Sequence, residues 1–306
     1  MGTVQGSPVI DVHAHCCDLR TPSTMHRTPL SIDALLRRLD EEGIDKAVLL
    51  PWPASPEAVT FPGLLAWEPD VVSQIRAAAR HPDRLIPFGN VDPRWGGNSP
   101  DADFGWLLQR FREMGCRGIG ELAGNLWFDD PRVINVVRHC AQAGLPVLFE
   151  SCGPGPGRYG LVDEVGSPHL ERLLQEVPDA VLIGHGPGFW AEIGHGLRPE
   201  EKSGYPKGPV GDGGSLQRLL RQYPNLYADL SAHSGYNALT RDPEYGIRFL
   251  QEFHDRLLFG TDTCFADAEG RMPQLGYLRQ LRTEGHLTQD QFDDIAGRNA
   301  ARILGL

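Results

Sequence analysis

Eight short apolar runs alternate with amphipathic stretches along almost the whole chain, and this alternation restricts the fold more than any other feature of the sequence. The runs cover residues 9–15, 45–51, 85–91, 116–122, 146–150, 180–185, 226–231 and 257–262. In one intervening stretch, SIDALLRRLDEEG, Leu35, Leu36 and Leu39 recur at helical spacing. Ser31 is the expected N-cap of that helix and Gly43 its expected end. Since strands that alternate with helices form parallel sheets and eight such units favour closure, we predict an α/β fold, the (β/α)8 TIM barrel.

The links between these elements differ in length at the two ends of the predicted barrel. Links from helix to strand are short, whereas links from strand to helix at 16–30, 51–65, 151–167 and 186–213 are long and rich in Pro and Gly. The long loops therefore follow the carboxyl ends of the strands, where barrel enzymes carry their sites. We predict a single domain over residues 1–306 with long loops on this C-terminal face, and we interpret 186–213 as a lid or a dimer contact.

Composition and charge restrict the partners of the chain. Its 306 residues, 41% of them hydrophobic, suffice for a large core, and the net charge of −11 argues against nucleic acid and anionic membranes as partners. There is no apolar run of membrane-spanning length, and the start MGTVQGSPV lacks the pattern of a secretory signal. We expect a cytoplasmic protein with reduced cysteines that binds a small molecule and forms a homo-oligomer, a dimer.

Polar side chains gather where the predicted strands end. His13 and His15 lie on one face of the first strand, because side chains alternate along a strand. Further polar side chains end the fourth, fifth, sixth and eighth strands, namely Glu121, Glu150, His185 and Asp262. Burying so many carboxylates and imidazoles together is costly unless they pair or bind a cation. Because a divalent ion with nitrogen and oxygen ligands satisfies all of them at once, the sequence predicts a metal site at this rim.

Several residues near the rim have two readings that the sequence leaves open. His185 is either a core histidine or a functional group, and its place at a strand end before a glycine favours function. Glu121 either meets substrate or anchors a loop, and His233 either meets substrate or caps the segment that follows. Arg158 is either a clamp for a substrate carboxylate or a surface residue, and Trp190 either meets an aromatic substrate or packs a loop on the barrel. We take Glu121, His233, Trp190 and Arg158 as candidate substrate contacts.

Three motifs resemble one enzyme family. DVHAH on the first strand, IGHGPGFW on the sixth and LLFGTD on the eighth, in this order, resemble the amidohydrolase superfamily. The resemblance is to its amidohydrolase-related branch, which includes aminocarboxymuconate semialdehyde decarboxylase-like proteins. It implies a TIM barrel with one divalent ion, zinc or manganese, held by His13, His15, a fifth-strand histidine and Asp262. It also implies that His185 activates a metal-bound water or hydrogen-bonds the substrate.

The fifth strand departs from the family pattern. Relatives commonly end this strand in histidine, whereas the chain reads PVLFE and places Glu150 there. A carboxylate still binds zinc or manganese, but it favours oxygen-preferring ions and lowers the effective charge of the ion. We expect a changed site rather than a lost one, with Glu150 as a fourth ligand.

Three functions fit these residues. The leading expectation is a metal-dependent hydrolase, in which a metal-activated water attacks an amide, ester or lactone of a small, aromatic substrate and His185 or Asp262 takes the proton. The alternative is a metal-dependent nonoxidative decarboxylase, in which His185 delivers a proton to carbon. A third reading is a non-catalytic barrel with a degraded metal site. The sequence does not separate the first two.

Overall fold

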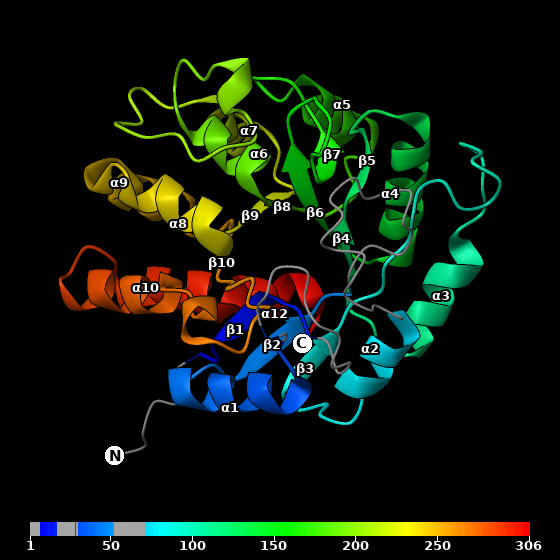
Figure 1. Cartoon of the computed structure of the whole chain (residues 1–306), viewed down its shortest axis with the longest axis horizontal. Helices are drawn as coiled ribbons and strands as arrows, with labels where there is room; N and C mark the ends of the chain where they lie inside the picture. Colours follow the sequence, from blue (N-terminus) through cyan, green and yellow to red (C-terminus); the bar gives the residue numbers. More distant parts are fainter. Residues whose placement is uncertain (1–6, 17–27, 29, 52–70) are drawn as a thin grey trace.

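The protein is described by a computed structural model that covers residues 7–16, 28, 30–51 and 71–306 (Figure 1). Its strands are β1 (Ile10–Ala14), β2 (Lys46–Leu49), β3 (Leu85–Pro87), β4 (Ile119–Leu122), β5 (Gly124–Trp127), β6 (Val147–Cys152), β7 (Gly160–Val162), β8 (Leu182–His185), β9 (Leu226–Asp229) and β10 (Leu257–Leu258). The predicted loops at 16–30 and 51–65 fall largely outside the described residues.

Helices follow most of these strands. They are α1 (Ile32–Glu42), α2 (Val71–Ala78), α3 (Gly105–Glu113), α4 (Pro131–Ala143), α5 (Pro168–Glu176), α6 (Pro187–Trp190), α7 (Ser215–Gln222), α8 (Ala232–Thr240), α9 (Pro243–Phe253), α10 (Gln274–Thr283), α11 (Gln289–Asp293) and α12 (Asn299–Leu304). Short 3-10 turns η3 (Ala191–Ile193), η4 (Pro199–Glu201) and η5 (Ala268–Gly270) and a π turn, η6 (Asp294–Arg298), complete the set. Among the described residues, no helix combines the length and the apolar character needed to cross a membrane.

The strands form a closed parallel barrel, as predicted. β1, β2 and β3 pair in that order, and β4, β6, β8, β9 and β10 form a second run of parallel neighbours. Two seams join these runs: a parallel bridge links Gly89 to Ile119, and another links Ala14 to Thr263. At the second seam the backbone N–H of Val12 also donates to the carbonyl of Phe259 over 3.0 Å. The expected (β/α)8 fold is therefore confirmed.

Two short strands lie outside the expected eight. β5 follows β4 directly, and β7 follows the loop after β6. β7 pairs with β6, and β5 pairs with β7 at the outer edge. Both are only three or four residues long and begin at glycines, so neither carries an apolar period that the sequence could reveal. They extend the sheet above the site end of β6.

The first helix shows how local sequence sets an element. The hydroxyl of Ser31 accepts a hydrogen bond from the N–H of Ala34, and Gly43 ends α1 in the left-handed conformation with φ of 66°. Leu35 and Leu39 are fully buried against the barrel. The predicted cap, end and buried face of this helix are thus confirmed.

A separate buried cluster fills the barrel and supports its carboxyl end. It contains Ile10, Val12, Val48, Leu50, Ile86, Phe88, Leu148, Ile183, Tyr227, Leu258, Ala300 and Leu304. Leu148 lies two residues before Glu150, and Ile183 lies two residues before His185, so these pairs point to the same face of their strands. An apolar layer therefore lies beneath a polar layer at the barrel mouth.

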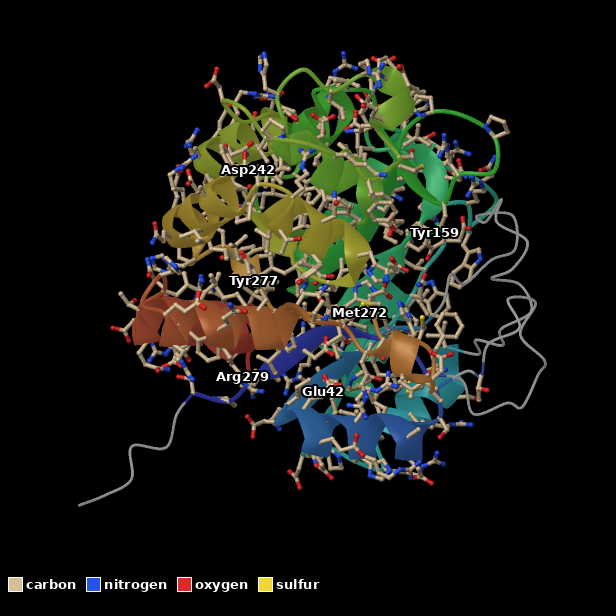
Figure 2. The ribbon with its side chains drawn as sticks, turned by 60° about the vertical axis from the view of Figure 1, so that its left-hand side comes forward. Glu42, Tyr159, Asp242, Met272, Tyr277 and Arg279 are labelled. Carbon is tan, nitrogen blue, oxygen red and sulfur yellow. The ribbon has the colours of Figure 1, made fainter. Side chains whose placement is uncertain are left out.

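The first and last units of the barrel are also joined outside the sheet. The guanidinium of Arg271 lies 3.0 Å from the carboxylate of Glu42. Arg279 of α10 donates to the Glu42 carbonyl over 2.8 Å, and Figure 2 labels these two residues. These contacts supplement the β1–β10 seam at the surface, where a single ion pair contributes little.

Candidate functional site

His13, His15 and Asp262 meet at the carboxyl end of the barrel. The Nε2 atoms of the two histidines lie 2.9 Å apart, and Oδ1 of Asp262 lies 3.4 Å from the first and 3.5 Å from the second. Asp262 adopts a left-handed backbone conformation with φ of 57°, which is uncommon for a residue other than glycine. The structure therefore brings three of the four predicted ligands into one cluster of possible metal ligands.

The contacts behind this cluster fit a bound cation. Nδ1 of His13 lies 2.7 Å from the carboxylate of Asp229, and Nδ1 of His15 lies 3.0 Å from the carbonyl of Leu50. Both partners accept hydrogen bonds, so Nδ1 carries the proton of each neutral ring and both Nε2 lone pairs face the same point. Two lone pairs at this separation repel each other unless a positive charge lies between them. The donor set thus fits one divalent ion.

The two histidines differ in their titration. Burial, followed by the neighbouring His13, lowers the pKa of His15 to about 3, which keeps its ring neutral. Burial and His185 also oppose charging of His13, but the carboxylates of Asp262 and Asp229 outweigh them and raise its pKa. The negative surroundings that raise the pKa of His13 also favour a metal cation at the same place.

His185, at the end of β8, lies beside the cluster. Its Nδ1 is 3.0 Å from Oδ2 of Asp229 and 2.9 Å from Oγ of Ser231, while its Nε2 lies 3.3 Å from Oε2 of Glu150. Burial opposes charging of this ring, but the hydrogen bond to Asp229 and the charge of Glu150 raise its pKa to about 10. His185 is therefore held from behind by a carboxylate, and its other nitrogen is presented toward Glu150.

Asp229 supports both histidines from the end of β9. Burial alone would raise the pKa of its carboxyl, but hydrogen bonds from His13 and His185 hold that pKa well below its usual range. The sequence interpretation missed this residue, although a signal existed, because the seventh apolar run carries a carboxylate two residues before its end. It orients the rings in the way that carboxylates behind metal-bound histidines do.

Glu150 and Glu121 form a pair of carboxyl groups beside His185. Burial raises the pKa of Glu150 well above its usual value, and a hydrogen bond links it to Glu121. Glu121 accepts a hydrogen bond from the hydroxyl of Tyr159 over 2.7 Å and lies 3.9 Å from His15 Nε2. Burial opposes ionisation of Glu121, but the surrounding histidines lower its pKa. A protonated Glu150 that donates to an ionised Glu121 satisfies both groups.

Glu150 therefore lies at the site but beside His185. Among the described residues, the two groups of possible metal ligands are His13 with His15 and Asp262, and His13 with Glu121 and His185. Glu150 belongs to neither group. A side chain at Gly186 would place its Cβ 1.8 Å from Oε1 of Glu150, which explains the glycine after His185 in the sixth-strand motif.

A cavity of about 400 Å³ opens above these residues. Its inner wall consists of His15, Glu121, Glu150, His185 and Asp262. Its outer wall comes from loops and α8, and consists of Arg158, Tyr159, Ser203, Tyr205 and Ser234. Ser234 is 2% exposed, and its hydroxyl has no hydrogen-bond partner among the described residues. An unpartnered buried hydroxyl at a cavity is a candidate ligand contact.

The barrel, the ligand cluster and the histidine beside it agree with one family. The sequence profile of the amidohydrolase family matches residues 10–306. The chain belongs to this family. No curated protein matches this chain at sequence level.

Solved structures share the fold of this chain at low sequence identity. An uncharacterised TIM-barrel protein from Bordetella bronchiseptica is 18% identical with a TM-score of 0.65, covering 97% of this chain and 98% of its own. A probable 2-pyrone-4,6-dicarboxylic acid hydrolase from Acinetobacter baumannii is 14% identical with a TM-score of 0.59, covering 97% and 99%. The 5-carboxyvanillate decarboxylase from Novosphingobium aromaticivorans, complexed with manganese and 4-hydroxy-3-methoxy-5-nitrobenzoic acid, is 16% identical with a TM-score of 0.56, covering 100% and 98%.

Two of the predicted substrate contacts lie outside the cavity. Trp190 is buried in the core, where its indole N–H donates to the carbonyl of Asp229 over 2.9 Å, and it does not line the cavity. His233 is exposed on α8, and its neighbour Ser234 lines the cavity instead. A helix turns by about 100° per residue, so a position one residue away points in a different direction. Glu121 and Arg158 do line the cavity, as expected of substrate contacts.

Proposed function

We propose that the protein is a metal-dependent enzyme that decarboxylates a small aromatic acid without oxidation. The observation that carries this proposal is the arrangement of His185, whose Nδ1 is held by Asp229 and whose Nε2 lies among the cavity residues. A histidine held in this way is suited to donate a proton from Nε2. The manganese-bound decarboxylase that shares the fold supports the same class of reaction.

His13, His15 and Asp262 would hold the ion, zinc or manganese. When bound, the ion supplies positive charge that binds the substrate carboxylate or a neighbouring oxygen. Asp229 and the carbonyl of Leu50 orient the two imidazoles toward it. This assignment needs no ligand from Glu150.

His185 performs the proton transfer in this proposal. The proton on Nε2 forms the new C–H bond at the carbon that carries the carboxylate. The bond from that carbon to the carboxylate then breaks, its electron pair remains with the ring, and carbon dioxide leaves. Solvent returns the proton to His185, so the net reaction consumes one proton. Asp229 stabilises the charged imidazole throughout.

The remaining cavity residues suit an aromatic acid. Arg158 is the one arginine or lysine among the described residues that line the cavity, and its guanidinium matches an anionic oxygen of the substrate. Tyr159 and Tyr205 add aromatic surface. The proton shared by Glu150 and Glu121 removes one negative charge that would repel an anionic substrate.

Hydrolysis is the second candidate, and Asp262 is the observation that favours it. Its side chain is 27% exposed beside both histidines, and burial in the barrel mouth raises its pKa to about 6. A carboxylate whose pKa is raised by its surroundings would suit a base that takes a proton from water. The probable 2-pyrone-4,6-dicarboxylic acid hydrolase shares the fold. Its substrate class makes lactones the first esters to test.

A parallel assay separates the two reactions. Protein loaded with manganese or zinc is offered hydroxybenzoates, lactones and aryl esters, while carbon dioxide and acid release are recorded together. We expect carbon dioxide from a hydroxybenzoate and, in heavy water, deuterium at the carbon that lost the carboxylate. Acid release from lactones or esters with no carbon dioxide from any acid would favour hydrolysis instead.

A further inference from the structure

A fully buried lysine lies inside the predicted lid, residues 186–213. The side chain of Lys202 is about 1% exposed, although the rest of residues 195–209 around it is half-buried or exposed. Lysine is among the residues least often buried, because its charge must find partners when water is removed. The contacts of Lys202 therefore require an explanation.

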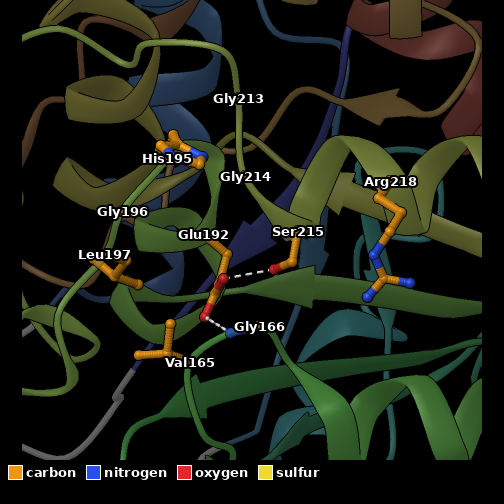
Figure 3. Close-up of a pocket in the computed structure, with 11 residues that line it drawn as sticks. Val165, Gly166, Glu192, His195, Gly196, Leu197, Gly213, Gly214, Ser215 and Arg218 are labelled. Carbon is orange, nitrogen blue, oxygen red and sulfur yellow. Dashed lines mark hydrogen bonds between the residues drawn. The ribbon is translucent and has the colours of Figure 1, made fainter.

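Lys202 forms a buried ion pair within the lid and a hydrogen bond to the loop before α5. Its Nζ lies 2.6 Å from Oε1 of Glu192 and donates to the hydroxyl of Ser167 over 3.1 Å. The same oxygen of Glu192 accepts from the N–H of Gly166 over 2.9 Å, and Oε2 accepts from the hydroxyl of Ser215 over 2.5 Å (Figure 3). One carboxylate thus connects the middle of the lid, the start of α7 and the loop before α5.

The base of the lid around Glu192 is not tightly filled. A cavity of about 360 Å³ lies there, lined by Glu192, His195, Leu197, Ser215 and Arg218 together with several glycines (Figure 3). Close packing therefore contributes little on this face of the lid, whereas Trp190 and Ile193, on either side of Glu192, are buried in the core. The ion pair and its hydrogen bonds add to this anchor, and to the bond from Asn237 to the carbonyl of Pro206, in holding the lid.

The stem of Lys202 fixes the neighbouring lid residues as well. A Cβ on Gly153 would lie 2.9 Å from Cγ of Lys202, so only glycine allows this close approach of the loop after β6. The N–H of Gly153 donates to Oγ of Ser203 over 2.6 Å. Ser203 and Tyr205 then line the substrate cavity. The buried Lys202 is therefore followed directly along the chain by the residues that form the outer wall of the cavity.

Stability alone does not account for a buried ion pair. Apolar residues of similar volume are often as stable as a buried pair, because desolvation of the charges offsets their attraction. A charged pair can instead select one register of the lid, because any other register would leave an unpaired buried charge.

We propose that Lys202 is a positioning residue for the substrate cavity. Its ion pair with Glu192 holds the lid in one register, so that Ser203 and Tyr205 are already in place as the outer wall before substrate binds. The expected change in substrate binding rests on the proposed function, which places the substrate in this cavity. The expected change in the position of the lid does not rest on it.

Proteolysis of the lid and binding of salicylate test this role. Lys202→Met removes the charge, and Lys207→Met is the matched control, because Lys207 is exposed on the same lid. A glutamate-specific protease cuts after Glu200 and Glu201, which remain in both variants. We expect Lys202→Met to be cut roughly tenfold faster than the wild type, and its manganese-loaded form to bind salicylate roughly tenfold more weakly with unchanged metal content. Lys207→Met should match the wild type in every measurement.

The double variant Lys202→Met with Glu192→Gln covers the case in which the single variant does not fold. It removes both buried charges, so its melting temperature should be closer to the wild type, while the lid should still be cut faster. Wild-type cutting rates in the double variant, or equal rates in Lys202→Met and Lys207→Met, would overturn the proposal. If the wild type binds no salicylate, the substrate class is wrong, and the cutting rates still decide the role of Lys202.

Discussion

The two walls of the cavity are held in place by different forces. The inner-wall residues lie at or next to the ends of barrel strands, where ladder hydrogen bonds fix the backbone and an apolar layer lies beneath the side chains. The outer wall is held by side-chain contacts within loops, such as the bond from Gly153 to Ser203 and the pair of Lys202 with Glu192. Reaction chemistry thus lies on the rigid wall, and contacts that select a substrate lie on the wall that loop changes alter most easily.

The largest effect should come from the first-strand histidines, because they would hold the ion. We expect His13→Ala or His15→Ala to weaken manganese and zinc binding by at least about 100-fold, since even residues behind metal ligands contribute 10- to 100-fold. Turnover should be lost, and the stability linked to metal binding should disappear. Metal analysis and thermal melts with and without ion check this.

His195→Ala is the matched control for these variants. His195 is exposed on the lid and lies outside the cavity that contains the cluster. It should retain wild-type metal content and melting temperature. Full metal content in both His13→Ala and His15→Ala would break the comparison, because the metal would then be bound somewhere other than the inner wall.

The next effect concerns turnover without loss of metal. His185→Asn keeps a hydrogen-bonding group next to Asp229 but cannot transfer a proton. We expect turnover to fall roughly 100- to 10,000-fold, the usual range for loss of a general acid or base, while bound metal stays near its wild-type level. Deuterium incorporation at the carbon that loses the carboxylate should fall in parallel. A variant with undiminished turnover would remove His185 from the mechanism.

The inner wall was accessible to prediction because strands restrict where side chains point. Once the first run is a strand, His13 and His15 must share a face, and parallel strands bring Asp262 and His185 to the same end of the barrel. The same reasoning applied to the seventh run would have added Asp229. What the strand pattern does not specify is pairing within the cluster, which is why Glu150 was expected at the ion and is found beside His185.

The outer wall could not be predicted, because it depends on contacts between distant loops. Ser203 reaches its partner Gly153 across 50 residues of sequence, and no periodic pattern links the two. Trp190 illustrates the related difficulty that a large aromatic residue after a strand is equally suited to a cavity and to the core. Its indole N–H found a partner in the carbonyl of Asp229, and the side chain is buried there.

A smaller loss of turnover is expected when Glu150 is replaced, and it separates the inner-wall residues that hold the ion from those that support His185. Oε2 of Glu150 lies 3.3 Å from Nε2 of His185, so Glu150→Gln replaces the carboxyl partner of that ring by an amide. A hydrogen bond to a charged group contributes about 1.5–3 kcal/mol, so turnover should fall by roughly 10- to 100-fold with metal affinity nearly unchanged. Titrations of zinc and manganese into wild type, Glu150→Gln and Glu150→His measure this. Weaker binding in Glu150→Gln, with a shift toward zinc in Glu150→His, would instead make Glu150 a ligand.

The smallest effect should come from the outer wall, at Ser234. Its hydroxyl is buried at the cavity with no partner among the described residues, so a substrate oxygen or nitrogen that meets it would gain one neutral hydrogen bond. Such a bond contributes about 0.5–1.5 kcal/mol, and Ser234→Ala should therefore raise KM by roughly 2- to 12-fold with little change in kcat. His233→Ala, at the exposed neighbouring position, is the control and should leave KM unchanged. Because the alanine leaves an apolar surface, a substrate analogue that lacks the polar group should bind the variant at least as well as the wild type. Equal KM values for Ser234→Ala and His233→Ala would show that the substrate does not use this wall.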